Sequence, residues 1–470
     1  MSNNPDRPED DKDPIDKIIG RVSDIFGKAT NIDPTRKPTD TDKFFRAVKN
    51  NKLDEVKAAL EAGFNPNQHD KSGDTPLHVC ARGNLTDMAA LLIEHKADPR
   101  RGKRDDEKHL PLNDAVNFGK AEMTEILARH GGYLPGNTID GWSLLHRACE
   151  KGKPRLVEAL LKAGANGNEP TANGATPLLI SVMRAQGEVA ELLLDYPGVA
   201  EQMNQLFVQT DEKKRTAFQL AVERGQGGIA RKMIIKGTLL NTLDADGFSP
   251  LQHAIRRGDV ELVAALVDGG ADTNRGNAHG TPLYYAAQAP EIRDENARAK
   301  IIDLLLRRGA DPDTPDAQTG KTPLMVLAAE HDRLPALKTL LAYTPALDLC
   351  DHSGMNAVFH ALKNGAAMTE LLKAGASPDA RHMKDASTPL IAAARGDDPH
   401  AVRRLLDAGA NPRLFDARGK SALSYARDNV VNEYAGAANA DTIVAMVEQK
   451  IAPETKARRK GKPRGGEWEL

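Results

Sequence analysis

Apolar and polar residues follow a pattern of short paired helices along most of this chain. In one copy of the pattern, Leu156, Val157, Leu160 and Leu161 recur at three- and four-residue steps. Leu262, Val263, Leu266 and Val267 repeat the same spacing about a hundred residues later. That spacing places the apolar side chains on one face of a helix. Because one apolar face must be buried, each such helix is expected to stack against neighbouring helices.

A short motif marks the start of each copy and sets a period. The copies start at Thr75, Leu110, Ser143, Thr176, Thr216, Ser249, Thr281, Thr322, Asn356, Thr388 and Ser421. Thr75-Pro76-Leu77-His78 is typical, and successive starts differ by 35, 33, 33, 40, 33, 32, 41, 34, 32 and 33 residues. A period of about 33 residues predicts a repeat architecture. With an atypical copy before Thr75, the chain holds about twelve units.

Each unit has a physical explanation. Threonine or serine caps a first helix, and the following proline occupies a first turn in which no amide hydrogen bond is lost. Glycines such as Gly152 and Gly258 then allow the turn into a second helix. Endings such as Ala163-Gly164-Ala165-Asn166 stop that helix before the next copy.

These motifs resemble the ankyrin repeat family over roughly residues 41–450. The resemblance implies an all-α fold, an ankyrin-type α-solenoid with β-turn fingers in which the short first helices line a concave face. We expect a disordered acidic N-terminus at 1–39 with an amphipathic helix at 14–29, and a solenoid at 40–450. Residues 40–70 and 419–450 are expected to cap it. Residues 451–470 are expected to form a disordered basic tail.

Composition narrows the class of protein. Aromatic residues make up 4% of the chain, which suits thin helical layers. The net charge of −2 gives no general attraction to nucleic acid or to an anionic membrane, so nucleic acid is unexpected except at the basic tail. Cys80, Cys149 and Cys350 lie far apart and indicate neither a disulfide framework nor a zinc site. No apolar run reaches the length of a membrane span, and we expect a cytoplasmic protein.

Catalysis has no candidate residues in this sequence. His78 and His146 stand at the fourth position of the motif, where ankyrin repeats use histidine to bond the backbone of an adjacent turn. No nucleophile–base set, metal-binding motif or phosphate-binding loop occurs at a usable spacing. We therefore predict a protein that is not an enzyme and that binds no cofactor or metal.

Partner binding has better candidates. The residue before each repeat start is expected at the tip of a finger, where Trp142, Arg215 and Phe248 stand out. A second row precedes the turn between helices and comprises Lys151, Arg184, Arg224 and Arg257, with Arg256 beside it. Such a basic band would favour a protein partner with an acidic segment. The alternatives are that these cations are only solvated and that Trp142 packs on a neighbouring finger.

Four segments depart from the repeat. Insertions at 195–214 and 290–299 could carry function or be tolerated extensions, and the second is expected to lengthen the turn between its helices. The apolar stripe of the N-terminal helix could dock on the first repeat or contact a membrane; it comprises Ile15, Ile18, Ile19, Val22, Ile25 and Phe26. The tail could solubilise the chain or serve as a targeting signal; its cations are Lys456, Arg458, Arg459, Lys460, Lys462 and Arg464.

Two functions follow from the sequence. The first is a non-catalytic protein–protein interaction scaffold that binds through its concave face and finger tips. The second is a bacterial effector exported into a host cell by a non-classical system, in which the same array grips a host protein and the basic tail directs export.

Overall fold

The computed structural model describes residues 39–136, 138–200, 215–431 and 439–460. These residues form two compact units, 39–114 and 115–460, each built from antiparallel helix pairs. The all-α repeat fold predicted from the sequence is confirmed. The first unit contains α2 (Asp40–Lys49), α3 (Leu53–Glu61), α4 (Pro76–Gly83) and α5 (Thr86–Glu94).

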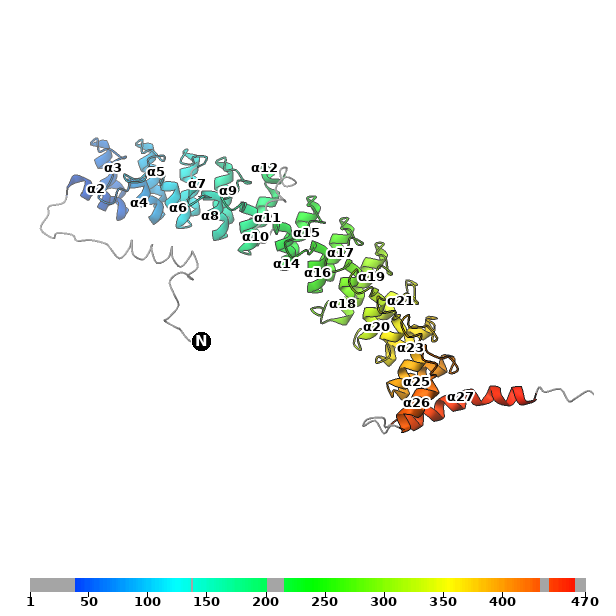
Figure 1. The fold of residues 1–470 in the computed structure, drawn as a ribbon. Coiled ribbons are helices and arrows are strands. Elements are labelled where there is room, and N and C mark those ends of the chain that lie inside the picture. The colour runs from blue at the N-terminus through cyan, green and yellow to red at the C-terminus, as the bar shows by residue number, and fades with distance from the viewer. Residues whose placement is uncertain (1–38, 137, 201–214, 432–438, 461–470) are drawn as a thin grey trace, which may run out of the picture. The chain divides into compact units, whose positions relative to one another are not determined.

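The second unit begins within α6 (Pro111–Asn117) and continues the same alternation of first and second helices (Figure 1). Its first helices are α8 (Leu144–Lys151), α10 (Pro177–Met183), α14 (Ala217–Glu223), α16 (Pro250–Arg257), α18 (Pro282–Gln288), α20 (Pro323–Ala329), α22 (Ala357–His360), α24 (Pro389–Arg395) and α26 (Ala422–Val431). Its second helices are α7 (Ala121–Arg129), α9 (Pro154–Lys162), α11 (Gly187–Asp195), α15 (Gly227–Ile235), α17 (Val260–Asp268), α19 (Glu295–Arg307), α21 (Leu334–Leu341), α23 (Gly365–Lys373), α25 (Pro399–Asp407) and α27 (Ala440–Lys460).

The repeat motif starts its helices as the sequence predicts. Ser249 is the N-cap of α16; its hydroxyl accepts from the amide of Gln252, whose side chain returns a bond to the Ser249 amide. Pro250 occupies the first turn, where it costs no hydrogen bond. At the other end Gly258 has φ +67°, a left-handed conformation in which glycine is least strained.

The core of each unit lies between stacked helices. Leu156, Leu160, Leu262 and Leu266 of the predicted apolar stripes are fully buried. First helices pack on first helices, as α16 does on α18, and second helices pack on second helices, as α17 does on α19. Since each pair contacts mainly its neighbours, stability is distributed repeat by repeat.

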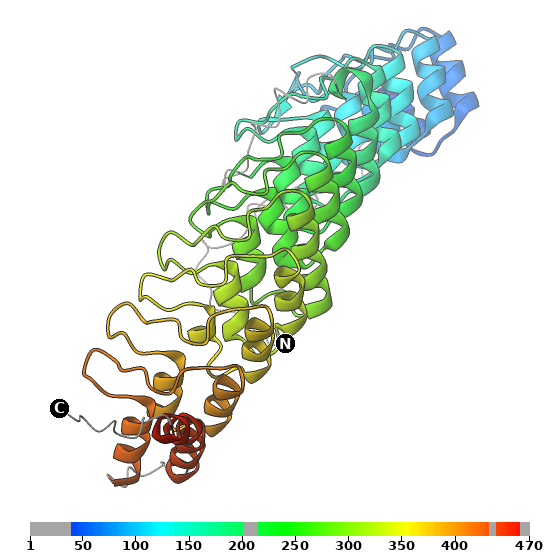
Figure 2. The same ribbon diagram turned by 90° about the vertical axis from the view of Figure 1, so that its right-hand side faces the viewer.

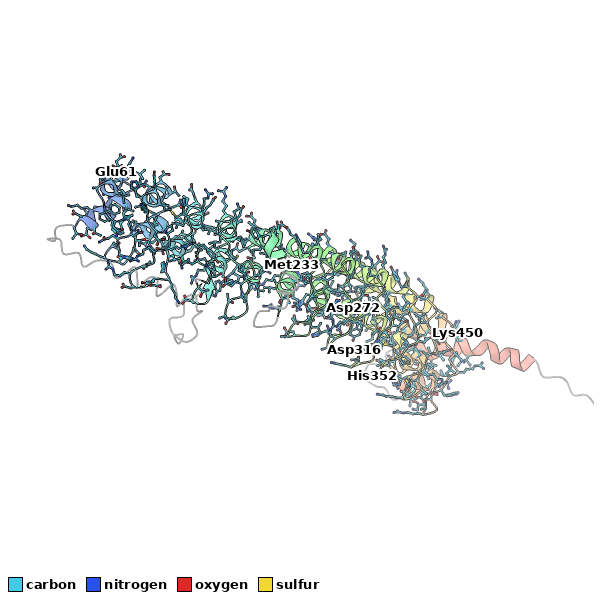
Figure 3. All side chains as sticks on the ribbon, turned by 90° about the horizontal axis from the view of Figure 1, so that it is seen from above. Glu61, Met233, Asp272, Asp316, His352 and Lys450 are labelled. Carbon is cyan, nitrogen blue, oxygen red and sulfur yellow. The ribbon has the colours of Figure 1, made fainter. Side chains whose placement is uncertain are left out.

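The turns that link successive repeats, here called fingers, lie side by side along one edge of the second unit (Figure 2). One finger forms a two-stranded hairpin in which β1 (Thr138–Ile139) pairs antiparallel with β2 (Trp142–Ser143), with Ile139 opposite Trp142. Neighbouring fingers are joined through their backbones: the amide of His352 donates to Thr319 O at 3.0 Å and that of Ala417 to Asp385 O at 2.8 Å. Asp316 and His352 mark two such fingers in Figure 3.

The insertions differ from expectation in detail. Asp195 is the last residue of α11, and a short helix α12 (Pro197–Ala200) follows it; residues 201–214 lie outside the described part of the chain. The insertion at 290–299 lengthens the turn between α18 and α19, as predicted, but only up to Asp294. Its second half extends α19 to 13 residues, because the side chain of Asp294 caps the amide of Asn296.

Both predicted caps contain helix pairs, and the C-terminal boundary was wrong. At the N-terminal end α2 and α3 occupy the predicted cap. At the other end α27 does not stop at Lys450 but continues to Lys460, so Lys456, Arg458, Arg459 and Lys460 belong to a helix. A proline, Pro453, follows Lys450 closely and would favour an end to the helix, but residues 454–460 are mostly helix formers, and Gly461 comes directly after them.

Candidate functional site

The predicted row of cations lies where the first helices of four successive repeats end. Lys151 is the last residue of α8, Arg184 and Arg224 are the C-caps of α10 and α14, and Arg257 is the last residue of α16. All four are exposed. Cations are favoured at helix C-termini because the helix dipole places negative charge there. Burial lowers the pKa of Lys151, and Glu150 opposes that shift.

Three members of this cation row bond to the preceding repeat. The pairs are Arg184 Nη2 with Glu150 Oε1 at 2.7 Å, Arg224 Nη1 with Met183 O, and Arg257 Nη1 with Glu223 O at 3.2 Å. Arg224 and Arg257 thus donate to carbonyls that end the preceding first helix and have no partner within that helix. Because a main-chain carbonyl carries no full charge, these contacts do not neutralise the two guanidinium groups. The row therefore links repeats and presents charge at the same time.

Finger tips are tied to the first helix of their own repeat over a spacing of eight residues. The pairs are Asp74 with Arg82, Arg215 with Glu223 at 2.6 Å, and Lys420 with Asp428 at 2.7 Å. In the repeat that starts at Ser249, Phe248 and Arg256 occupy the equivalent two positions. There the guanidinium of Arg256 lies over the ring of Phe248, 5.3 Å from its centroid. Arg215 and Arg256, predicted as partner-binding cations, thus have contacts within their own repeat.

Phe248 belongs to an aromatic cluster between two fingers. Its ring stacks on His279 of the next finger, with centroids 3.8 Å apart and planes at 8°. Tyr285 meets it edge-on at 5.7 Å, and His253 lies tilted at 5.3 Å. Phe248 is half-buried as a result. Its ring contributes to the packing of neighbouring fingers, which reduces the area that a partner could contact.

Trp142 is also half-buried, and it lies on strand β2 and not in an irregular turn. Its ring meets His146 of the same repeat edge-on at 6.1 Å. Trp142 is therefore partly exposed on the hairpin β1–β2.

His78 and His146 have the structural role predicted for them. Nδ1 of each ring faces the N-cap residue of its helix, Thr75 or Ser143. Nε2 lies 2.9 Å from His109 O in the first case and 2.8 Å from Glu169 O in the second. Burial lowers the pKa of both rings, that of His78 to about 4.

The sequence reasoning missed two exposed apolar residues beside the cation row. Phe118 stands eight residues after its repeat start, the same position as the four cations, and is 46% exposed. Met183, next to Arg184, is 39% exposed. The position of Phe118 in the repeat was a signal, because an apolar side chain replaces a cation there.

Other predicted residues lie outside the described part of the chain or have side chains that are not described. The N-terminal helix at 14–29, Lys462 and Arg464 fall outside the described residues, and side chains after Ala452 are not described. Within the described ranges no helix is long and apolar enough to cross a membrane, and no cluster of three metal-binding side chains occurs.

Burial raises the pKa of the Cys80 and Cys149 thiols, that of Cys149 to about 12. A raised thiol pKa disfavours either cysteine as a nucleophile.

Comparison with known proteins places this architecture in a family. Ankyrin repeat models match residues 44–138, 145–194, 218–316, 293–382 and 385–417, and one of them alone covers more than half of the chain. The chain belongs to the ankyrin repeat family, a class typical of protein–protein interaction.

Several proteins are similar to parts of the chain. The B-cell lymphoma 3 protein homolog of Mus musculus is 26% identical over 50% of this chain and 51% of its own length. The transient receptor potential cation channel subfamily A member 1 of Homo sapiens is 25% identical over 82% of this chain and 35% of its own length. The chain thus spans about half or less of these relatives. A crystal structure of an ankyrin repeat domain from Acinetobacter baumannii shares 23% identity over 43% of this chain and 98% of its own, with a TM-score of 0.38.

Proposed function

We propose that this protein is a non-catalytic interaction scaffold that holds an acidic segment of a protein partner along the cation row. The observation that carries the proposal is the position of Lys151, Arg184, Arg224 and Arg257 at equivalent ends of four consecutive first helices. Arg224 and Arg257 bond to carbonyls and so retain their charge for a partner. Aligned cations of this kind speed association with an acidic chain.

Charge alone gives little affinity, since an exposed ion pair contributes about 0–1 kcal/mol. Apolar anchors must add to it. Phe118 and Met183 are exposed beside the row, whereas Phe248 and Trp142 are half-buried against neighbouring rings. We therefore place the principal anchors at Phe118 and Met183 and secondary contacts at Trp142 and Phe248. A partner segment with acidic and apolar residues in alternation fits this surface.

A peptide-binding experiment tests the proposal. The probe is a fluorescent peptide of alternating Glu and Leu, compared with one in which Gln replaces Glu. Arg224→Gln with Arg257→Gln removes two charges and keeps a side-chain amide donor for each carbonyl. We expect roughly tenfold weaker binding of the acidic peptide at low salt, or about 1.4 kcal/mol. Phe118→Ala should mainly speed dissociation.

The control removes the same charge elsewhere in the second unit. Arg231 in α15 and Arg307 in α19 are exposed cations on second helices. Changing both to glutamine should leave peptide binding unaltered. Equal loss in the two double variants would mean that net charge alone attracts the peptide. No discrimination between the Glu and Gln peptides would reject the acidic partner.

A further inference from the structure

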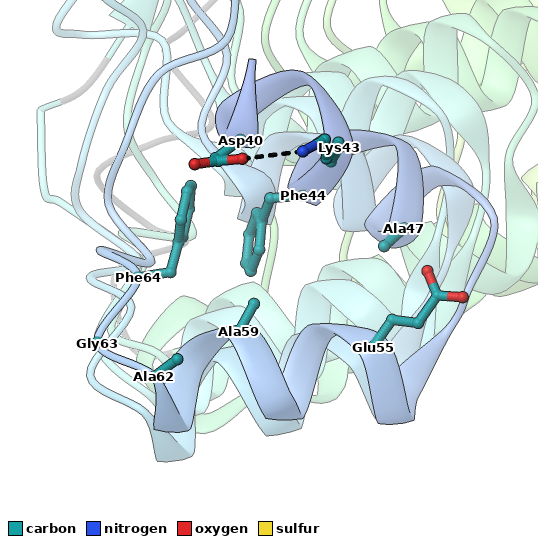
Figure 4. Close-up of a pocket in the computed structure, with 9 residues that line it drawn as sticks. All are labelled: Asp40, Lys43, Phe44, Ala47, Glu55, Ala59, Ala62, Gly63 and Phe64. Carbon is teal, nitrogen blue, oxygen red and sulfur yellow. Dashed lines mark hydrogen bonds and ion pairs between the residues drawn. The ribbon is translucent and has the colours of Figure 1, made fainter. Parts of the chain in front are cut away.

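The first repeat carries an apolar groove that, among the described residues, is lined by α2, α3 and the turn after α3 alone. Figure 4 shows it between α2 and α3, with the rings of Phe44 and Phe64 at one end. These rings stack with centroids 4.0 Å apart. Ala47 and Ala59 line the space between the helices, which has a volume of about 470 Å³. All nine lining residues fall between Asp40 and Phe64, so the following repeat contributes none of them.

In an ankyrin stack a face of this kind normally receives another pair of helices, as α4 receives α2 and α5 receives α3. The rim is mixed in charge: Asp40 and Lys43 form an ion pair of 3.1 Å on α2, and Glu55 lies on the α3 side. An occupant should therefore be helical, with an apolar stripe and flanking charges of both signs.

We propose that residues 14–29 of this chain dock in this groove as an additional N-terminal capping helix. Their apolar stripe has one large residue at every three- or four-residue step, from Ile15 to Phe26. The opposite face carries Asp16, Lys17, Arg21, Asp24 and Lys28, which matches the mixed charge of the rim. The stripe supplies an apolar surface that can cover the groove, and the two segments are neighbours in the sequence.

The length and exit point of the connecting chain allow this docking. A complete capping box between Thr39 and Asp42 fixes the start of α2, so the chain leaves the repeat next to Asp40 on the groove rim. The ten residues 30–39 can span about 33 Å when extended, several times the width of a helix. Pro34 and Pro38 oppose a helix that would run straight on into α2. The segment can therefore turn back over the groove.

Thiol labelling in the full-length chain tests the docking. Ala59→Cys places a thiol in the groove, and Ala58→Cys places one on the adjacent exposed position of α3. Cys350, which is exposed, is changed to serine in both, while Cys80 and Cys149 are buried. Each cysteine variant is then compared with a second version of itself that also carries Ile18→Ser and Val22→Ser.

Loss of the stripe should speed labelling of Ala59→Cys roughly tenfold and leave Ala58→Cys unchanged. The matched control, Lys17→Ser with Arg21→Ser, alters the polar face at the preceding positions and should leave both rates unaltered. Equal rates for Ala59→Cys with and without the stripe would overturn the proposal. Protection that rises with protein concentration would also overturn it, in favour of a second copy of the chain in the groove.

Discussion

The carboxylate of Asp244 links a finger to His253 on the first helix of the same repeat, because its two oxygens bond to different groups. Oδ1 of Asp244 accepts the amide of Phe248 at 2.8 Å and so shapes the finger turn. Oδ2 lies 2.7 Å from Nε2 of His253 on α16, and both side chains are buried. Asp351 with His360, and Asp416 with Tyr425, repeat the arrangement at the same nine-residue spacing. The finger and the first helix are thereby held in one orientation.

Replacing Asp244 by asparagine should destabilise this repeat by about 1–3 kcal/mol. Arg256 lies 3.1 Å from Nδ1 of His253 and can only donate, so the proton of the neutral ring is on Nε2. The amide nitrogen of an asparagine would then face a second donor, whereas its oxygen could still accept from Phe248. Amide exchange in α16 measures the loss.

Asp70→Asn is the matched control. Oδ1 of Asp70 accepts the amides of Ser72 and Asp74 in the same kind of turn, but the residue nine positions later is Val79. No side-chain bond across the repeat is lost there, so the cost should be well below that at Asp244. Equal costs would show that the turn, and not the histidine contact, determines the effect.

His78 should make the stability of the first unit depend on pH. Burial lowers the pKa of its ring from about 6.5 to about 4, so the unfolded chain binds more protons between these values. Stability is then greatest above pH 6.5 and falls as the pH is lowered towards 4, by an amount on the order of 3 kcal/mol. Amide exchange in α4, corrected for the intrinsic rate, measures this slope.

His78→Gln should flatten that pH dependence without loss of the structural bonds. Gln219 and Gln252 occupy the same motif position in other repeats, where they close the capping box and donate to a carbonyl of the next finger. Glutamine does not titrate in this range. An unchanged slope in the variant would assign the pH dependence to other groups.

Arg298 holds the second insertion together from inside the fold. It is 1% exposed and donates to Ala286 O at 2.6 Å, Ala289 O at 2.9 Å and Ile292 O at 2.8 Å, with Glu295 3.0 Å from Nε. Arg298→Met keeps much of the volume but leaves these acceptors unpaired, at a cost of about 3–5 kcal/mol.

The loss should be confined to α18, α19 and their immediate neighbours, because repeats couple only to adjacent repeats. Amide exchange along the chain would detect it. Arg307→Met, on the exposed side of α19, serves as the control and should change protection little. A similar effect of both substitutions would reject the structural role of Arg298.

The sequence by itself determined the repeat register, the helix starts and the buried faces. Thr-Pro-Leu caps, left-handed glycines and the spacing of Leu262 and Leu266 act within a few residues, so local physics decides them. The pairing of Arg215 with Glu223 also follows a fixed eight-residue spacing and could have been read from the sequence. The limit of the final helix was not decided in the same way, because Pro453 interrupts the helix formers that run up to Lys460.

Only the tertiary structure decided which side chains form contacts between stacked repeats, and with which partners. Arg224 and Arg257 reach carbonyls 41 and 34 residues away, and Phe248 stacks on His279 of the next finger. The sequence predicts these residues near the surface, but their partners depend on the rotamers and offset of adjacent repeats. Those are set by packing between helices that share no local sequence, which is why the cations were found by pattern and their contacts only by structure.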